Sequence, residues 1–196
     1  NIVLQHLFPK DGEGRPVNEV EKLLRQHSTL PDHPDAPWDW KLPEDIKVLP
    51  QDCAPGGNKV FVTGSTGFLG PFVVRDLLLA ERHVIALVRA SNAEAGKIRL
   101  MSALQTIGLD GELEKLANEN LTVICGSVGP KYFGLQKVEF DELAIDVGYV
   151  LHMAALVDLT GDFRKHLRSN VHGTVEVLRL AFQAHARVIF TSTTDV

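Results

Sequence analysis

A glycine-rich segment at residues 63–70 has the residue types and spacing of a loop that binds the phosphates of a dinucleotide. It reads TGSTGFLG and lies between an apolar run and an apolar helical segment. The first glycine permits a sharp exit from a strand, the second lets the backbone approach a pyrophosphate, and the third allows close packing of helix on strand. A glycine-rich turn without a ligand is the alternative, but the strand–turn–helix setting favours the phosphate loop. The predicted cofactor contacts are Gly64, Ser65, Thr66, Gly67, Phe68, Leu69 and Gly70.

A second chemical signal is Arg89, directly after the predicted second strand. In NAD-preferring sites an acidic residue at this place holds the ribose 2′-hydroxyl. A guanidinium suits a 2′-phosphate, and no carboxylate is present there to repel it. Arg99, about two and a half turns into the next helix, is a second candidate partner, with a surface helix charge as the alternative. The alternative for Arg89 is a solvated charge at the end of a strand. If Arg89 instead binds a 2′-phosphate, the cofactor is NADP(H).

A parallel sheet is needed to position these residues, and the pattern from residue 59 onward predicts one. Uninterrupted Val, Ile and Leu runs are typical of strands buried on both faces, and the amphipathic segments between them supply right-handed crossovers. The fold class is therefore α/β, with a Rossmann-like doubly wound parallel sheet. The expected strands are 59–62, 83–88, 121–125, 149–152 and 187–190.

Helix ends and composition divide the chain further. Ser91-Asn92 can cap a helix over 93–107 that Gly108 closes, and Asp162 can precede a long helix to Ala184. Upstream, one amphipathic helix is expected over 17–27, followed by a proline-rich stretch. We therefore expect a helix and linker over 1–57 and an NADP-binding domain over 58–196. Both ends of the chain look cut from something longer.

Composition excludes several classes of protein. The 196 residues carry a formal net charge of −5, with no basic field for nucleic acid or an anionic membrane. The two cysteines and eight histidines show no disulfide framework or metal-ligand spacing, and we expect no metal. Apolar stretches fall well short of the roughly 20 residues that a membrane span needs. A cytoplasmic protein is expected.

Several segments together resemble a known family, the thioester reductase domains that end many nonribosomal peptide synthetases, polyketide synthases and carboxylic acid reductases. These belong to the extended short-chain dehydrogenase superfamily. The match covers about residues 58–196, and its motifs appear in family order. A weaker match, around Trp38 and the LPED run at 42–45, looks like what joins a carrier-protein domain to such a reductase. The matching segments are VTGSTGFLG at 62–70, LVRA at 87–90, HMAALV at 152–157, SNVHGT at 169–174 and FTST at 190–193.

This resemblance implies a reaction and a partner. NADPH hydride would reduce a thioester on the phosphopantetheine arm of an upstream acyl or peptidyl carrier protein, releasing an aldehyde or, after further reduction, an alcohol. Thr193 would be the catalytic hydroxyl that binds the substrate carbonyl. Its partners in the family, a Tyr and a Lys in Y-x-x-x-K spacing, lie downstream and are absent here, because Tyr132 and Tyr149 both precede the fifth strand. The 196 residues alone are expected to be inactive, truncated before the C-terminal substrate subdomain.

The resemblance also implies roles for residues of the pocket walls. Ala154 and Ala155 would let the backbone run beside the nicotinamide ribose, with simple tight packing as the alternative. Asn170 would hold a water or backbone group near the site, or else only fix its helix. The family usually has Asp after the third strand's glycine, whereas this chain has Ser127. Ser127 and Val128 are therefore expected only as walls of the adenine pocket.

Two other functions stay open. One is a redox-silent relative that releases product by Dieckmann-type cyclisation, forming a carbon–carbon bond without hydride. The other is a module that binds NADP and performs no chemistry. Fatty acyl-CoA and aminoadipate reductases share much of the fingerprint, so the acyl group is not fixed by the sequence.

Overall fold

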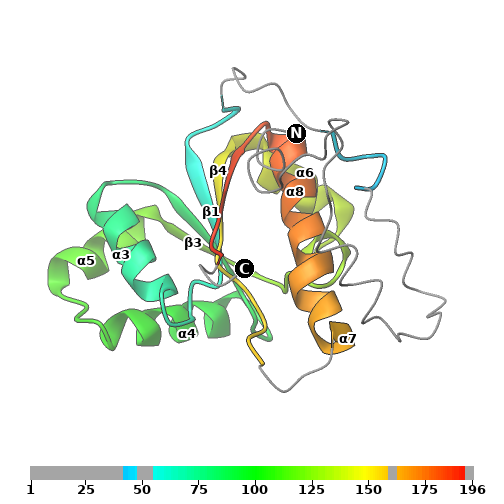
Figure 1. Ribbon diagram of the computed structural model, residues 1–196. Helices are drawn as coiled ribbons and strands as arrows, with labels where there is room; N and C mark the ends of the chain where they lie inside the picture. Colours follow the sequence, from blue (N-terminus) through cyan, green and yellow to red (C-terminus); the bar gives the residue numbers. More distant parts are fainter. Residues whose placement is uncertain (1–41, 48–54, 159–162, 193–196) are drawn as a thin grey trace, which may run out of the picture. The chain divides into compact units, whose positions relative to one another are not determined.

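The computed structural model describes residues 42–47, 55–158 and 163–192. Contacts divide the chain into two units, Asn1–Pro43 and Glu44–Val196, and the second contains the sheet. Five strands lie parallel in the order β3-β2-β1-β4-β5, which confirms the predicted Rossmann-like sheet (Figure 1). The strands are β1 (Lys59–Thr63), β2 (Val84–Val88), β3 (Leu121–Cys125), β4 (Val147–His152) and β5 (Arg187–Phe190).

Helices cover both faces of this sheet (Figure 1). Helices α3, α4 and α5 pack on one face, and α6 and α8 pack on the other. No helix among the described residues is long and apolar enough to cross a membrane. The helical segments are α3 (Gly70–Leu79), α4 (Ala93–Gln105), α5 (Gly111–Asn120), the 3₁₀ turn η1 (Lys131–Gly134), α6 (Lys137–Asp146), α7 (Phe163–His166), the π-helical turn η2 (Leu167–Val171) and α8 (His172–Ala184).

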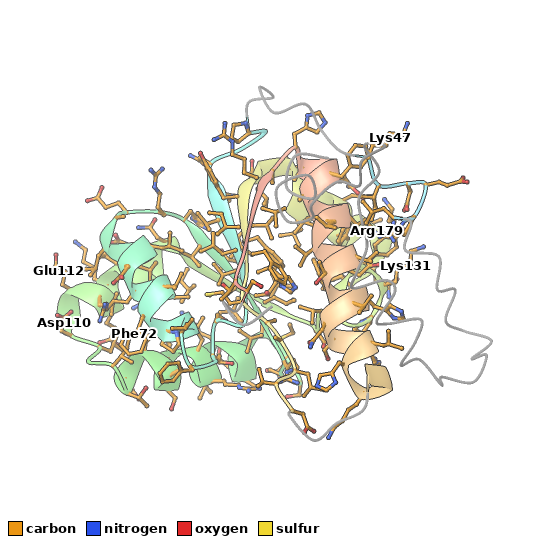
Figure 2. All side chains as sticks on the ribbon, in the orientation of Figure 1. Lys47, Phe72, Asp110, Glu112, Lys131 and Arg179 are labelled. Atoms are coloured by element: carbon orange, nitrogen blue, oxygen red, sulfur yellow. The ribbon has the colours of Figure 1, made fainter. Side chains whose placement is uncertain are left out.

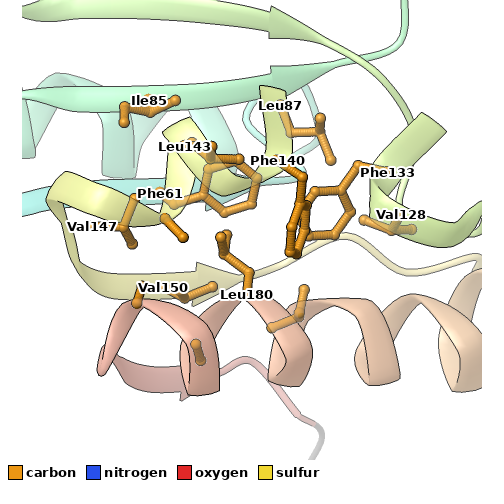
Figure 3. Packing of buried hydrophobic residues seen from close by; sticks show 14 residues of the cluster. Phe61, Ile85, Leu87, Val128, Phe133, Phe140, Leu143, Val147, Val150 and Leu180 are labelled. Carbon is orange, nitrogen blue, oxygen red and sulfur yellow. The ribbon is translucent and has the colours of Figure 1, made fainter. Parts of the chain in front are cut away.

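Alternation along β1 builds two hydrophobic cores. Val60 and Val62 point to the α3–α5 side, whereas Phe61 points to the α6–α8 side. There Phe61 stacks on Phe133, with ring centroids 5.2 Å apart, and Phe133 meets Phe140 at 5.7 Å (Figure 3). Because both faces of the central strands are buried, their apolar runs are continuous, as the sequence pattern requires.

Two helical predictions need correction. A single helix was expected between β2 and β3, but the structure has two, because Asp110 caps a second one through its Oδ1, 2.8 Å from the Leu113 nitrogen (Figure 2). The helix expected to run unbroken to Ala184 is interrupted by η2. By contrast, the cap predicted at Ser91-Asn92 is confirmed, and Asn92 provides it, with its Oδ1 2.9 Å from the Ala95 nitrogen.

The N-terminal predictions fall only partly on described residues. The helix at 17–27 and Asp162 lie outside them. Within the stretch expected to be linker, Asp45 forms an ion pair with Arg179 of α8, and the Gly56 N–H donates to the His185 carbonyl at 3.2 Å (Figure 2 labels Arg179). These contacts lie within the second unit, which therefore includes the described part of the expected linker from Glu44 onward.

Candidate functional site

A pocket of about 210 Å³ lies at the carboxyl ends of β1, β2, β3 and β4. The strand order reverses between β1 and β4, and open α/β sheets bind ligands at such a switch point. The pocket therefore lies where the fold class predicts a ligand. It is lined by Thr63, Gly64, Thr66, Gly67, Leu87, Arg89, Arg99, Gly126, Ser127, Val128, Met153, Ala154, Ala155, Leu156 and Ser169.

The glycine loop has the close packing that its spacing predicts. Gly64 has φ +75°, and a Cβ there would lie 2.7 Å from the Ala154 nitrogen. A Cβ on Gly70 would lie 2.3 Å from the Gly64 carbonyl oxygen, so a side chain would separate α3 from β1. The Gly67 N–H donates to that same oxygen at 2.9 Å and closes the turn. The backbone thus leaves no room for side chains at two of the three glycines.

The start of α3 has the features of an anion site. No side chain caps its first turn, and Pro71 occupies that turn without needing a partner for an N–H. Ser65 is 1% exposed, and its Oγ has no hydrogen-bond partner among the described residues. A buried hydroxyl without a partner is costly, and a phosphate oxygen at this loop would satisfy it. The donor set therefore fits a dinucleotide pyrophosphate.

Not every residue of the predicted loop faces the pocket. Phe68 is 90% exposed and Leu69 is 48% exposed, and neither lines the pocket. Ser65 and Gly70 are also absent from the lining, so the pocket takes Gly64, Thr66 and Gly67 from the predicted loop. Thr193, the predicted catalytic hydroxyl, lies outside the described residues.

Arg89 and Arg99 are brought together at the rim. The Arg99 guanidinium donates to the Arg89 carbonyl oxygen over 2.8 Å, and both residues line the pocket. Gly96 lets α4, which contains Arg99, pack closely on the sheet, because a Cβ at this position would lie only 3.0 Å from the Val123 side chain of β3. Within the described ranges, no carboxylate pairs with either guanidinium, and both cations are available to an anion.

The opposite walls come from the ends of β3 and β4. The Ser127 N–H donates to the Phe133 carbonyl at 2.9 Å, which fixes the wall that includes Val128. The loop after β4 presents Ala154 and Ala155. Asn170 stands behind this loop: its Oδ1 accepts from the Leu156 N–H at 2.7 Å, and its Nδ2 donates to the Leu156 carbonyl at 3.0 Å. Asn170 thus holds a backbone group of the pocket wall.

His152, expected only as a strand-end residue, is 1% exposed and lies behind the same wall. Its Nδ1 is 2.7 Å from the Thr63 Oγ1, and its Nε2 is 3.3 Å from the Thr174 Oγ1. Burial lowers its pKa to about 4, so it is neutral near pH 7. Over the described residues, no group of three His, Cys, Asp or Glu is placed to hold a metal ion.

Six residues that line the pocket were not predicted from the sequence. Thr63 directly precedes Gly64, and Ser169 directly precedes Asn170, both of which were predicted site residues. Their positions next to these residues could have identified them from the sequence. Leu156 enters the lining because Asn170 holds its backbone, which no local pattern reveals. The missed residues are Thr63, Leu87, Gly126, Met153, Leu156 and Ser169.

Comparison with known proteins gives a consistent set of relatives. Residues 62–196 match the family model described as Male sterility protein, an NAD-binding family. The chain is 38% identical over 165 residues to the nonribosomal peptide synthetase asaC of Aspergillus flavus, covering 81% of this chain and 16% of that protein. It is 33% identical over 187 residues to the aldehyde reductase lnaA of the same organism, covering 94% of this chain and 16% of lnaA.

Among solved structures, the terminal R domain from the myxalamid PKS-NRPS biosynthetic pathway superposes with a TM-score of 0.65 at 29% identity. The match covers 74% of this chain and 40% of that domain. The chain therefore spans less than half of a solved R domain and about a sixth of the curated relatives it matches. On the family model and these likenesses, the chain belongs to the Male sterility protein family, as the N-terminal part of a thioester reductase domain of the extended short-chain dehydrogenase superfamily.

Proposed function

We propose that this chain is the nucleotide-binding part of an NADPH-dependent reductase that releases a carrier-bound acyl or peptidyl thioester as an aldehyde or alcohol. One observation carries the proposal: the glycine loop, which leads into helix α3 without a side-chain cap, lines the same pocket as Arg89 and Arg99. The family binds a nicotinamide dinucleotide, and the two arginines support NADP(H) over NAD(H).

Each part of the dinucleotide has a proposed place. Backbone N–H groups around Gly67 and the start of α3, with the Ser65 hydroxyl, would hold the pyrophosphate. Arg89 and Arg99 would hold the 2′-phosphate through charge-assisted hydrogen bonds. Proposed contacts that remain are Ser127 and Val128 for adenine and Ala154 and Ala155 for the nicotinamide ribose. When bound, the cofactor would supply the hydride.

The proposed substrate comes from the relatives. A nonribosomal peptide synthetase and a terminal R domain from a PKS-NRPS pathway are among them, and lnaA is named an aldehyde reductase. A phosphopantetheine-bound thioester on an upstream carrier protein is the substrate class that such a terminal reductase would meet. We therefore propose that residues 1–57 follow a carrier domain and that residues 58–196 form the NADP-binding part.

Proton donation needs residues beyond those that line the pocket. Thr193 is proposed to bind the substrate carbonyl. Neither tyrosine of the chain lines the pocket: Tyr132 packs on Phe140 with ring centroids 4.9 Å apart, and Tyr149 packs in the opposite core. We propose that the 196 residues bind NADPH without reducing a thioester, because a phenol beside a lysine must complete the site.

The test uses the complete protein with an acyl group loaded on its carrier. NADPH consumption and the released product are followed together, with NADH in a parallel reaction. The proposal expects an aldehyde or alcohol, formed in step with NADPH oxidation and much more slowly with NADH. Release of a cyclised product without NADPH oxidation would overturn it in favour of the redox-silent function, and NADPH binding without any release would favour a non-catalytic module.

A further inference from the structure

A hydrogen-bonded chain centred on His152 runs behind the pocket wall. It starts at Ala154, whose N–H donates to the Thr63 Oγ1 at 3.2 Å, and the imidazole lies next at 2.7 Å. On the other side of the ring is Thr174, whose Oγ1 donates to the Asn170 carbonyl at 2.6 Å. The chain thus joins the ends of β1 and β4 to the start of α8 through side chains that are buried or half-buried.

Counting protons along this chain fixes the state of the ring. The Thr174 hydroxyl has one proton, and it is given to the Asn170 carbonyl, so its oxygen must accept from the ring. The His152 Nε2 therefore carries a proton. The Nδ1 is then an acceptor, and the Thr63 hydroxyl donates to it while accepting the Ala154 N–H. Every donor in the chain has an acceptor only when the imidazole is neutral and protonated at Nε2.

The other ring states leave a polar group unsatisfied. With the proton on Nδ1, the Thr63 hydroxyl would accept twice and its own proton would have no acceptor in the chain. The Nε2 lone pair would also face an oxygen whose proton is already engaged. Of the described residues that meet the ring from β1, β5 and α8, namely Thr63, Phe190 and Thr174, none is ionisable, so none can form an ion pair with a charged imidazole.

The two ends of this chain hold one short segment. Ala154 is fixed by Thr63, and both backbone groups of Leu156 are fixed by the Asn170 amide. The segment between them includes Ala155 and forms one wall of the pocket. We propose that His152 is a positioning residue whose neutral Nε2–H imidazole fixes residues 153–156 as the wall against which the cofactor binds. This inference rests on the proposed function for what the wall contacts, but the fixing of the wall can be tested without cofactor.

The decisive pair of variants is Thr174→Val and Thr174→Ser in the complete protein. Valine has nearly the shape of threonine but cannot accept the His152 N–H, whereas serine keeps the hydroxyl. Two quantities are measured: backbone hydrogen exchange of the peptide that covers residues 153–157, and the dissociation constant for NADPH. We expect Thr174→Val to raise both roughly tenfold, and Thr174→Ser to leave both within about twofold of the wild type.

The outcomes separate the two ideas. If Thr174→Val exchanges and binds as the wild type does, or if Thr174→Ser is as impaired as Thr174→Val, the positioning role of His152 is wrong. If exchange follows the prediction but the wild-type protein does not bind NADPH, the positioning role stands and the proposed function fails. Should Thr174→Val not fold, His152→Gln, which keeps one acceptor and one donor, is compared with His152→Leu, and protection of the wall only in the glutamine variant supports the inference.

Discussion

Lowering the pH should destabilise the domain through His152, with a size that follows from the pKa of its imidazole. Burial lowers this pKa from 6.5 to about 4. Between these values the unfolded chain binds a proton that the folded chain does not, so protonation favours unfolding and stability rises with pH. The free energy of unfolding should fall by roughly 2 kcal/mol between pH 7 and pH 5, and by about 3 kcal/mol once the pH is below 4.

Urea unfolding at pH 7 and pH 5, in the wild type and in His152→Gln, isolates this contribution. Other groups titrate too, since burial also raises the pKa of Glu176, but the difference between the two proteins cancels them. The variant should lose less stability than the wild type on acidification, by roughly 2 kcal/mol.

Thr174→Val is the matched control, because it disturbs the same hydrogen bonds but keeps the titrating imidazole. It should retain most of the pH dependence of the wild type. Equal losses of stability on acidification in the wild type and in His152→Gln would refute the reasoning, since they would mean that the buried imidazole titrates alike in the folded and unfolded chains.

Three further predictions concern the loop and its helices. Gly64→Ala should lower the free energy of unfolding by more than about 1 kcal/mol, because φ is +75° and the methyl would meet backbone; an unchanged urea midpoint would contradict this. Ser65→Ala should cost almost no stability, since its hydroxyl has no partner within the described ranges, yet should weaken NADPH binding measured by titration. Asn92→Ala should cost about 1 kcal/mol by loss of the α4 cap, and a cost near zero would argue against that bond.

The sequence predicts the sheet and the phosphate loop because their signals are local. Strands buried on both faces need continuous apolar runs, and the run at 121–125 became β3 with the same bounds. The glycine spacing works in the same way, because a Cβ at Gly70 would meet Gly64 and Ser65 of the same loop, and the turn itself holds Gly64 at φ +75°. Such features depend on neighbours in the chain, so spacing alone locates them.

What the sequence does not reveal depends on residues that are far apart in the chain. Thr63 lies 89 positions from His152, and Thr174 lies 22 positions beyond that histidine, so no spacing rule connects them. Phe133 enters the core from a left-handed turn, with φ +61°, a conformation that an aromatic residue rarely adopts without tertiary packing. The π-helical turn before α8 contains Asn170, whose side chain accepts from the Leu156 N–H. This contact, too, joins residues that are not neighbours in the sequence.

Calorimetric titration of NADPH and NADH into the complete protein tests most directly the proposal that Arg89 makes this an NADP(H) site. Arg89→Ala is compared with Arg82→Ala, an exposed arginine before β2 that does not line the pocket. We expect tighter binding of NADPH in the wild type and in Arg82→Ala, and loss of most of that preference in Arg89→Ala, by roughly tenfold or more. Equal affinity of the wild type for both nucleotides, or an unchanged preference in Arg89→Ala, would contradict it.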